Sequence, residues 1–171
     1  MTAKRITWRG ASFSVCRRYR WDLWRWWHPW GEPVGSRFAM FIGLNPSTAD
    51  ETEDDPTVRR CIRYAQAWGC DGMCMTNIFA WRDTDPQGMR AQAFPIGDLN
   101  DKTLRGIARG AQIVLCAWGV HGAHMNRGRN VERMLRQDGR KLHVLGLTKD
   151  GHPKHPLYLR ADLTPVEWGE T

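Results

Sequence analysis

Two asparagines lie at the ends of short apolar runs, where a ligand could reach their amides. Asn45 follows the run FAMFIGL at 38–44, and Asn77 lies in the run GMCMTNIF at 72–79. A side-chain amide offers both a hydrogen-bond donor and an acceptor, so it can read the polar edge of a planar ring. Two alternatives remain open: Asn45 caps a turn before Pro46, or Asn77 is a satisfied bridge between strands.

Hydroxyl, carboxyl and aromatic side chains follow the same two runs. Beyond the first run lie Pro46, Ser47, Thr48 and Asp50. Phe79 closes the second run, and Trp81 and Arg82 follow it. Aromatic faces can stack on a planar ring while the polar groups hydrogen-bond its edge.

Histidines follow two further apolar runs, AQIVLCAW at 111–118 and KLHVLGL at 141–147. We interpret His121 and His124 as loop residues. The segment GHPKHPLYL at 151–159 carries two more histidines, together with several lysine and hydroxyl side chains nearby. For His155, the sequence leaves phosphate contact, catalysis and packing open.

Several common sites have no counterpart in this sequence. It contains neither Gly-x-Gly-x-x-Gly nor Gly-Lys-Ser/Thr, the patterns that cradle a pyrophosphate or triphosphate. The five cysteines have an odd count and unmatched spacing, which argues against a disulfide framework. Cys70 and Cys74 form the one close pair, and no convincing further metal ligands accompany them. We therefore expect reduced thiols, no metal site and no cofactor.

The secondary-structure pattern places all these groups on one edge of a sheet. Four apolar runs suit strands that are buried on both faces, and an alternating segment predicts a hairpin near the N-terminus. Helices are expected over 56–68 with Asp55 as N-cap and Gly69 after its end, over 98–109 with Asp98 as cap, and over 129–138 before Gly139. This order predicts an α/β protein, a three-layer α/β/α sandwich with a central, mainly parallel four-stranded sheet and an N-terminal antiparallel hairpin. Because parallel strands finish at one edge, the polar groups should converge there.

Size and charge constrain the partners. The chain has 171 residues, which suits a single domain with a hairpin at 12–30 and an α/β core at 37–160. The sequence contains neither a membrane-spanning run nor a signal peptide, so we expect a cytoplasmic monomer that does not contact membranes. The net charge of +7 favours a polyanionic partner.

The motifs GLNPSTAD, DDPTVRR and GHPKHPLYL resemble those of a bacterial and phage group known as domain-of-unknown-function family 1643. The resemblance covers the chain from Tyr19 to Leu159. It implies membership of that family and no particular activity.

A more distant resemblance is to the uracil-DNA glycosylase superfamily. GLNP at 43–46, MTNIFAWR at 75–82, LCAWG at 115–119 and HPKHPLYLR at 152–160 are similar to its strand-end motifs, in the same order. The resemblance implies the superfamily's α/β sandwich and a base-reading role for Asn77. Where some members carry a water-activating acid, this sequence has Asn45, as other members do. His152 and His155 both fit the catalytic histidine's place, and we favour His155. The cysteines do not match the iron–sulfur pattern of some members.

Together these features lead us to expect a protein that recognises a base in nucleic acid, DNA rather than RNA, and an N-glycosylase that acts on a flipped uracil-like or modified base. Asn45 and His155 are the expected catalytic residues. The expected substrate contacts are Asn77, Phe79, Trp81, Pro46 and Asp50. Leu157 would fill the vacated stack. The expected backbone contacts are Ser47, Thr48, Lys149, His152, Lys154 and Arg160. The alternatives are a non-cleaving module that binds or modifies a nucleotide or modified base, and a small-molecule enzyme unrelated to nucleic acid.

Overall fold

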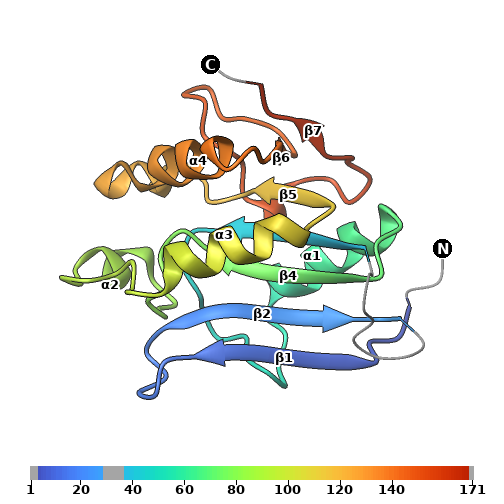
Figure 1. Ribbon diagram of the computed structural model, residues 1–171, viewed down its shortest axis with the longest axis horizontal. Helices are drawn as coiled ribbons and strands as arrows, with labels where there is room; N and C mark the ends of the chain where they lie inside the picture. The colour runs from blue at the N-terminus through green and yellow to red at the C-terminus, as the bar shows by residue number, and fades with distance from the viewer. Residues whose placement is uncertain (1–3, 29–36, 170–171) are drawn as a thin grey trace.

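A seven-stranded mixed β-sheet runs through the computed structural model, which describes residues 4–28 and 37–169 (Figure 1). The strand order is β1-β2-β4-β3-β5-β6-β7. The strands are β1 Trp8–Phe13, β2 Arg20–Trp26, β3 Phe38–Gly43, β4 Gly72–Asn77, β5 Ile113–Cys116, β6 Leu142–Val144 and β7 Val166–Glu167. The expected α/β class is confirmed, and the sheet is wider than the four strands expected.

The four apolar runs form the parallel centre of this sheet. β3 pairs in parallel with β4 and with β5, and β5 pairs in parallel with β6. Every residue of β3 and β4 is buried, which explains why these strands are apolar without alternation. Each strand is shorter than its apolar run.

The N-terminal hairpin is part of the same sheet. β1 and β2 pair with Trp8 opposite Trp26, and β2 continues antiparallel against β4, with Leu23 opposite Met75. The hairpin starts at Trp8, earlier than the expected residue 12, and the end of the expected range, at 29–30, lies outside the described residues. The short β7 extends the sheet at its other end through an antiparallel pairing with β6.

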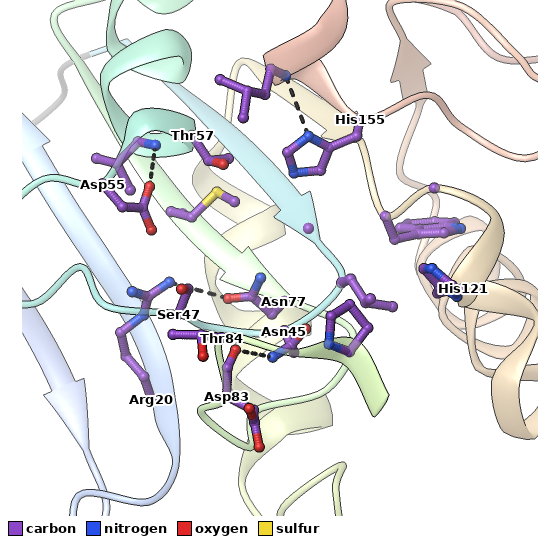
Figure 2. Close-up of a pocket in the computed structure, with 18 of the residues that line it drawn as sticks. Arg20, Asn45, Ser47, Asp55, Thr57, Asn77, Asp83, Thr84, His121 and His155 are labelled. Carbon is purple, nitrogen blue, oxygen red and sulfur yellow. Dashed lines mark hydrogen bonds between the residues drawn. The ribbon is translucent and has the colours of Figure 1, made fainter. Parts of the chain in front are cut away.

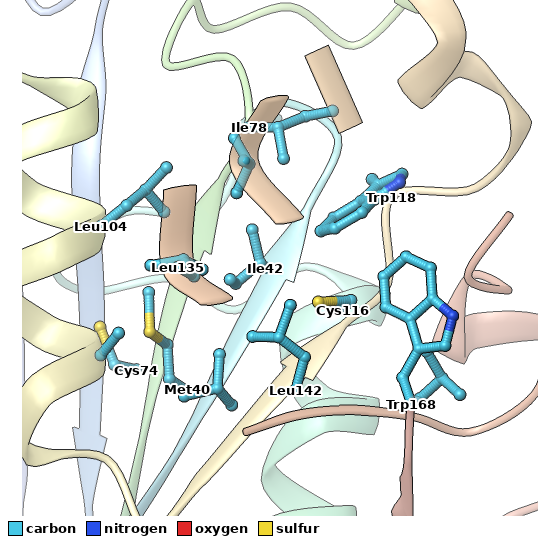
Figure 3. Close-up of a cluster of buried hydrophobic side chains, with 14 of the residues drawn as sticks. Met40, Ile42, Cys74, Ile78, Leu104, Cys116, Trp118, Leu135, Leu142 and Trp168 are labelled. Atoms are coloured by element: carbon cyan, nitrogen blue, oxygen red, sulfur yellow. The ribbon is translucent and has the colours of Figure 1, made fainter. Parts of the chain in front are cut away.

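Helices cover both faces of the sheet. α1, Pro56–Ala67, packs on the face that carries Phe41 and Leu115. α3, Asn100–Gly110, and α4, Arg127–Gln137, pack on the other face (Figure 3). There Leu104 and Leu135 meet Met40, Ile42 and Leu142. No helix in the described segments is long and apolar enough to cross a membrane.

The helix caps are partly as expected. Asp55 caps α1 by accepting a hydrogen bond from the Val58 amide at 2.8 Å, and Gly69 follows the helix with φ of 77°. Asp98 does not cap α3, because Leu99 occupies the N-cap position and the helix starts at Asn100.

α4 begins at residue 127, two residues before the expected start, and Gly139 follows it with φ of 75°. The sequence pattern did not predict the short helices. These are α2 Pro86–Arg90, η1 Val120–Asn126 and η2 Pro156–Tyr158.

Candidate functional site

A pocket of about 530 Å³ opens where the central parallel strands end (Figure 2). Gly43 ends β3, Asn77 ends β4, and Trp118 follows β5, and all three residues line the pocket. Its polar wall includes Arg20, Asn45, Ser47, Asp55, Asn77 and His155. The two asparagines and His155 therefore come together, although 110 positions separate Asn45 from His155 in the sequence.

Asn45 is held through its amide nitrogen. Nδ2 donates to the backbone carbonyl of Asp83 at 2.9 Å and to that of Pro46 at 3.1 Å. Both hydrogens of the amide are used, which leaves Oδ1 as the atom able to accept a hydrogen bond from a ligand or a water. No backbone amide of the described residues donates to Oδ1 of Asn45, so the bond to Pro46 is not the turn cap of the alternative interpretation.

Asn77 is held through its amide oxygen. It is 2% exposed, and Oδ1 accepts a hydrogen bond from Nη2 of Arg20 at 3.3 Å. Within the described segments no acceptor is bonded to Nδ2. Asn77 is therefore a bridge between strands on its oxygen side and a free donor on its nitrogen side.

His155 presents a neutral imidazole. Its Nδ1 accepts a hydrogen bond from the Leu157 amide at 3.4 Å, and burial lowers the pKa of the ring, with Asp55 opposing that shift. An accepting Nδ1 places the proton on Nε2, so Nε2–H is a donor available to the pocket.

Arg20 lines the pocket, although the sequence did not indicate it as a site residue. Polar Arg20 stands between apolar Tyr19 and Trp21, a pattern typical of a half-buried strand, yet Arg20 is 2% exposed. Its Nη1 donates to the Ala49 carbonyl at 2.8 Å, and it forms no ion pair with any described carboxylate. Burial lowers the pKa of Arg20 to about 10, so the guanidinium is still protonated at neutral pH.

Asp55 adds a carboxylate to the pocket wall beyond its role as helix cap. One oxygen accepts the Val58 amide, and the helix N-terminus stabilises the negative charge. The negative charge of Asp55 also opposes the effect of burial, which lowers the pKa values of both Arg20 and His155. The sequence signal was the DDPT cap motif, which indicates a helix start and carries no indication of a ligand.

Four of the expected substrate contacts lie outside the pocket lining. Phe79 is fully buried in the core beside His124, and Trp81 packs edge-on against Tyr19. The carbonyl of Pro46 accepts hydrogen bonds, and Asp50 caps its own loop through the amides of residues 52 and 53. These loop bonds lower the pKa of Asp50 to about 2.

The residues expected at the nucleic-acid backbone are dispersed. Ser47 lines the pocket, whereas Thr48, Lys149 and Lys154 are exposed outside the lining. Leu157, expected to fill the vacated stack, also lines the pocket. Arg160 is also exposed, and Asp162 pairs with it at 2.6 Å. His152 lines a neighbouring cavity of about 290 Å³ that shares Trp118 with the main pocket.

Comparison with known proteins supplies a family and no activity. A family model described as "Protein of unknown function (DUF1643)" matches residues 20–157. No curated protein and no solved structure matches the chain.

Proposed function

Because the chain belongs to the DUF1643 family, whose description names no activity, we propose a function from the pocket: recognition of a flipped uracil-like or modified base in nucleic acid, with hydrolysis of its N-glycosidic bond. One observation carries the proposal. Asn45, Asn77 and His155 share one pocket and offer it an acceptor, a donor and a donor, respectively.

The pocket suits a planar polar ring. Its volume of about 530 Å³ lies within the range of pockets that bind small ligands. Nδ2 of Asn77 can donate to a ring carbonyl, which favours bases that carry a keto oxygen at this point over bases that carry an amino group. Since Phe79 and Trp81 do not line the pocket, the aromatic wall is assigned to Trp118, which does.

The hydrolytic step uses the remaining groups. Oδ1 of Asn45 accepts a hydrogen bond from a water, and the oxygen of that water forms a bond to the sugar carbon C1′ while the bond from C1′ to the base nitrogen breaks. The electron pair of the broken bond stays on the base, and Nε2–H of His155 stabilises the charge that develops there. The Asp55 carboxylate takes the proton that the attacking water loses.

Three features support a nucleic-acid substrate. The net charge of +7 attracts a polyanion. A base within a duplex must leave the stack before a pocket of this kind can hold it. Leu157 lies in the pocket wall, from where its side chain could fill the space that the base leaves in the stack. The resemblance of GLNP, MTNIFAWR and the His-Pro segment to uracil-DNA glycosylases points the same way, with DNA favoured over RNA.

The direct test is release of a base from defined oligonucleotides. Single-stranded and duplex DNA carrying uracil, hydroxymethyluracil or hypoxanthine is incubated with the protein, and abasic sites are revealed by alkaline cleavage. We expect cleavage that Asn77→Ala abolishes and Asn130→Ala preserves, because Asn130 lies on α4 and, among the described residues, its side chain bonds only to Arg133. Binding without abasic sites would reject hydrolysis and favour the non-cleaving module. Absence of both would reject base recognition.

A further inference from the structure

The guanidinium of Arg20 lies beside the Asn77 amide, and both residues line the pocket (Figure 2). We infer that Arg20 is the positioning residue that holds the Asn77 amide in one orientation and thereby determines which base edge the pocket accepts. The inference rests on the proposed base recognition. It gives Arg20, which lines the pocket, a role in selecting the base that the pocket binds.

The backbone brings the two side chains together. Arg20 begins β2, Asn77 ends β4, and these strands are antiparallel neighbours. The Arg20 amide donates to the Ala80 carbonyl at 3.0 Å, so the residue is joined to the segment that leaves β4. Its Nη1 is held by the Ala49 carbonyl at 2.8 Å, which leaves Nη2 directed at Asn77.

The chemistry of the pair allows one amide orientation. A guanidinium has hydrogen-bond donors and no acceptor. The oxygen of Asn77 must therefore face Arg20, since a turn of the amide by half a rotation would set N–H groups against N–H groups. Nδ2 then faces the pocket, and a ligand must present an acceptor to it. An amino group at that position would leave buried donors unpaired on both sides, which weakens binding by roughly 10- to 100-fold.

No described carboxylate competes with Asn77 for the guanidinium of Arg20. Among the described residues none forms an ion pair with Arg20, although Asp55 is near enough to act on its charge. The buried arginine on the same strand differs: Arg25 pairs with Asp54 at 2.7 Å. A carboxylate at Arg20 would take up its donors, so its absence keeps them available to the Asn77 oxygen.

The test measures a ratio of affinities. Dissociation constants for deoxyuridine and deoxycytidine are measured by NMR titration with the wild type, Arg20→Lys and Arg20→Gln. We expect the wild type to prefer deoxyuridine by roughly 10- to 100-fold. Lysine also only donates, so Arg20→Lys should retain most of the preference. Glutamine can either donate or accept, so Asn77 can turn and the preference should fall to a few-fold.

A folded Arg20→Gln variant that keeps the wild-type ratio would overturn the inference and leave base recognition intact. A wild type that binds neither nucleoside would overturn both. If Arg20→Gln does not fold, Asn77→Asp provides the second measurement. Its carboxylate retains an oxygen for Arg20 and turns an acceptor to the pocket, so the preference should reverse toward deoxycytidine. An unchanged preference for deoxyuridine would overturn the inference.

Discussion

Gly43 ends β3 in register with Asn77 at the end of the parallel neighbour β4, and the pair leaves no room for a side chain at position 43. A Cβ atom there would lie 2.8 Å from Nδ2 of Asn77 and 2.9 Å from Cε of Met75. Real Cβ atoms do not approach so closely. The glycine of GLNP therefore leaves room for Nδ2 of Asn77, the donor that we propose meets a ligand.

Gly43→Ala should damage the pocket more than the fold. Met75 is flexible and can move, whereas the Asn77 amide is fixed by Arg20 and must tilt away. Overpacking of this kind costs about 1–3 kcal/mol, or roughly 2–12 °C in Tm for a chain of this size. Nucleoside affinity should fall by about tenfold or more, since a 1.4 kcal/mol loss is tenfold. Titration with a nucleoside measures the affinity, and thermal unfolding measures the Tm.

Gly106→Ala is the matched control for that substitution. It lies in α3, where an added Cβ meets nothing within 4 Å, so it should leave binding unchanged and stabilise the helix by up to about 1 kcal/mol. Wild-type affinity in Gly43→Ala would show that the position of the Asn77 amide does not matter for the ligand.

His155 should make stability depend on pH. Burial lowers its folded-state pKa below the usual 6.5, so the unfolded chain binds a proton that the folded protein resists. The stabilisation is complete above about pH 6.5 and is lost as the pH falls from there through the folded-state pKa. Urea unfolding between about pH 7.5 and pH 5 should show this loss in the wild type and a smaller one in His155→Gln.

His121→Gln serves as the comparison, because His121 is exposed at the same pocket. It shows how much of any change in the profile comes from removing a histidine at this pocket. Identical profiles for His155→Gln and the wild type would mean that burial of His155 does not govern the titration.

Binding to single-stranded DNA should depend on salt through the exposed lysines. Lys149 and Lys154 lie on the segment that carries His155, and neither side chain has a described ion pair. If each contacts one phosphate, removing both should reduce the slope of log K against log salt by about 1.4, at about 0.7 per contact. Fluorescence anisotropy over a salt series measures the slope.

Arg109→Ala is the control with the same kind of charge change. It lies at the end of α3 next to Gly110, which is near Phe38 at the start of β3, so it is at the opposite edge of the sheet from the pocket. Because this variant removes one positive charge and the lysine variant removes two, a change of slope half as large would indicate diffuse attraction in place of a binding surface beside the pocket.

Local patterns were enough for the central part of the fold. The buried strands β3 and β4 could be predicted because a strand covered on both faces must be apolar throughout. Asp55 and Gly69 could be predicted as the ends of α1 because capping depends on a few neighbouring residues. The prediction that Asp98 caps α3 was wrong, because the helix starts at Asn100. The side chain of Asn100 donates hydrogen bonds to the carbonyls of residues 77 and 78, which are distant in the sequence.

The sequence alone determined that polar groups would follow strands ending at one edge of a sheet, and the structure brings Asn45, Asn77 and His155 to one pocket. Only the tertiary structure decided that Arg20 is buried beside Asn77 and that Phe79 turns into the core. Hydrophobic periodicity indicates which face of each strand or helix is buried. It does not report which distant strand lies beside it, and pairing of β2 with β4 is what placed a guanidinium against the amide.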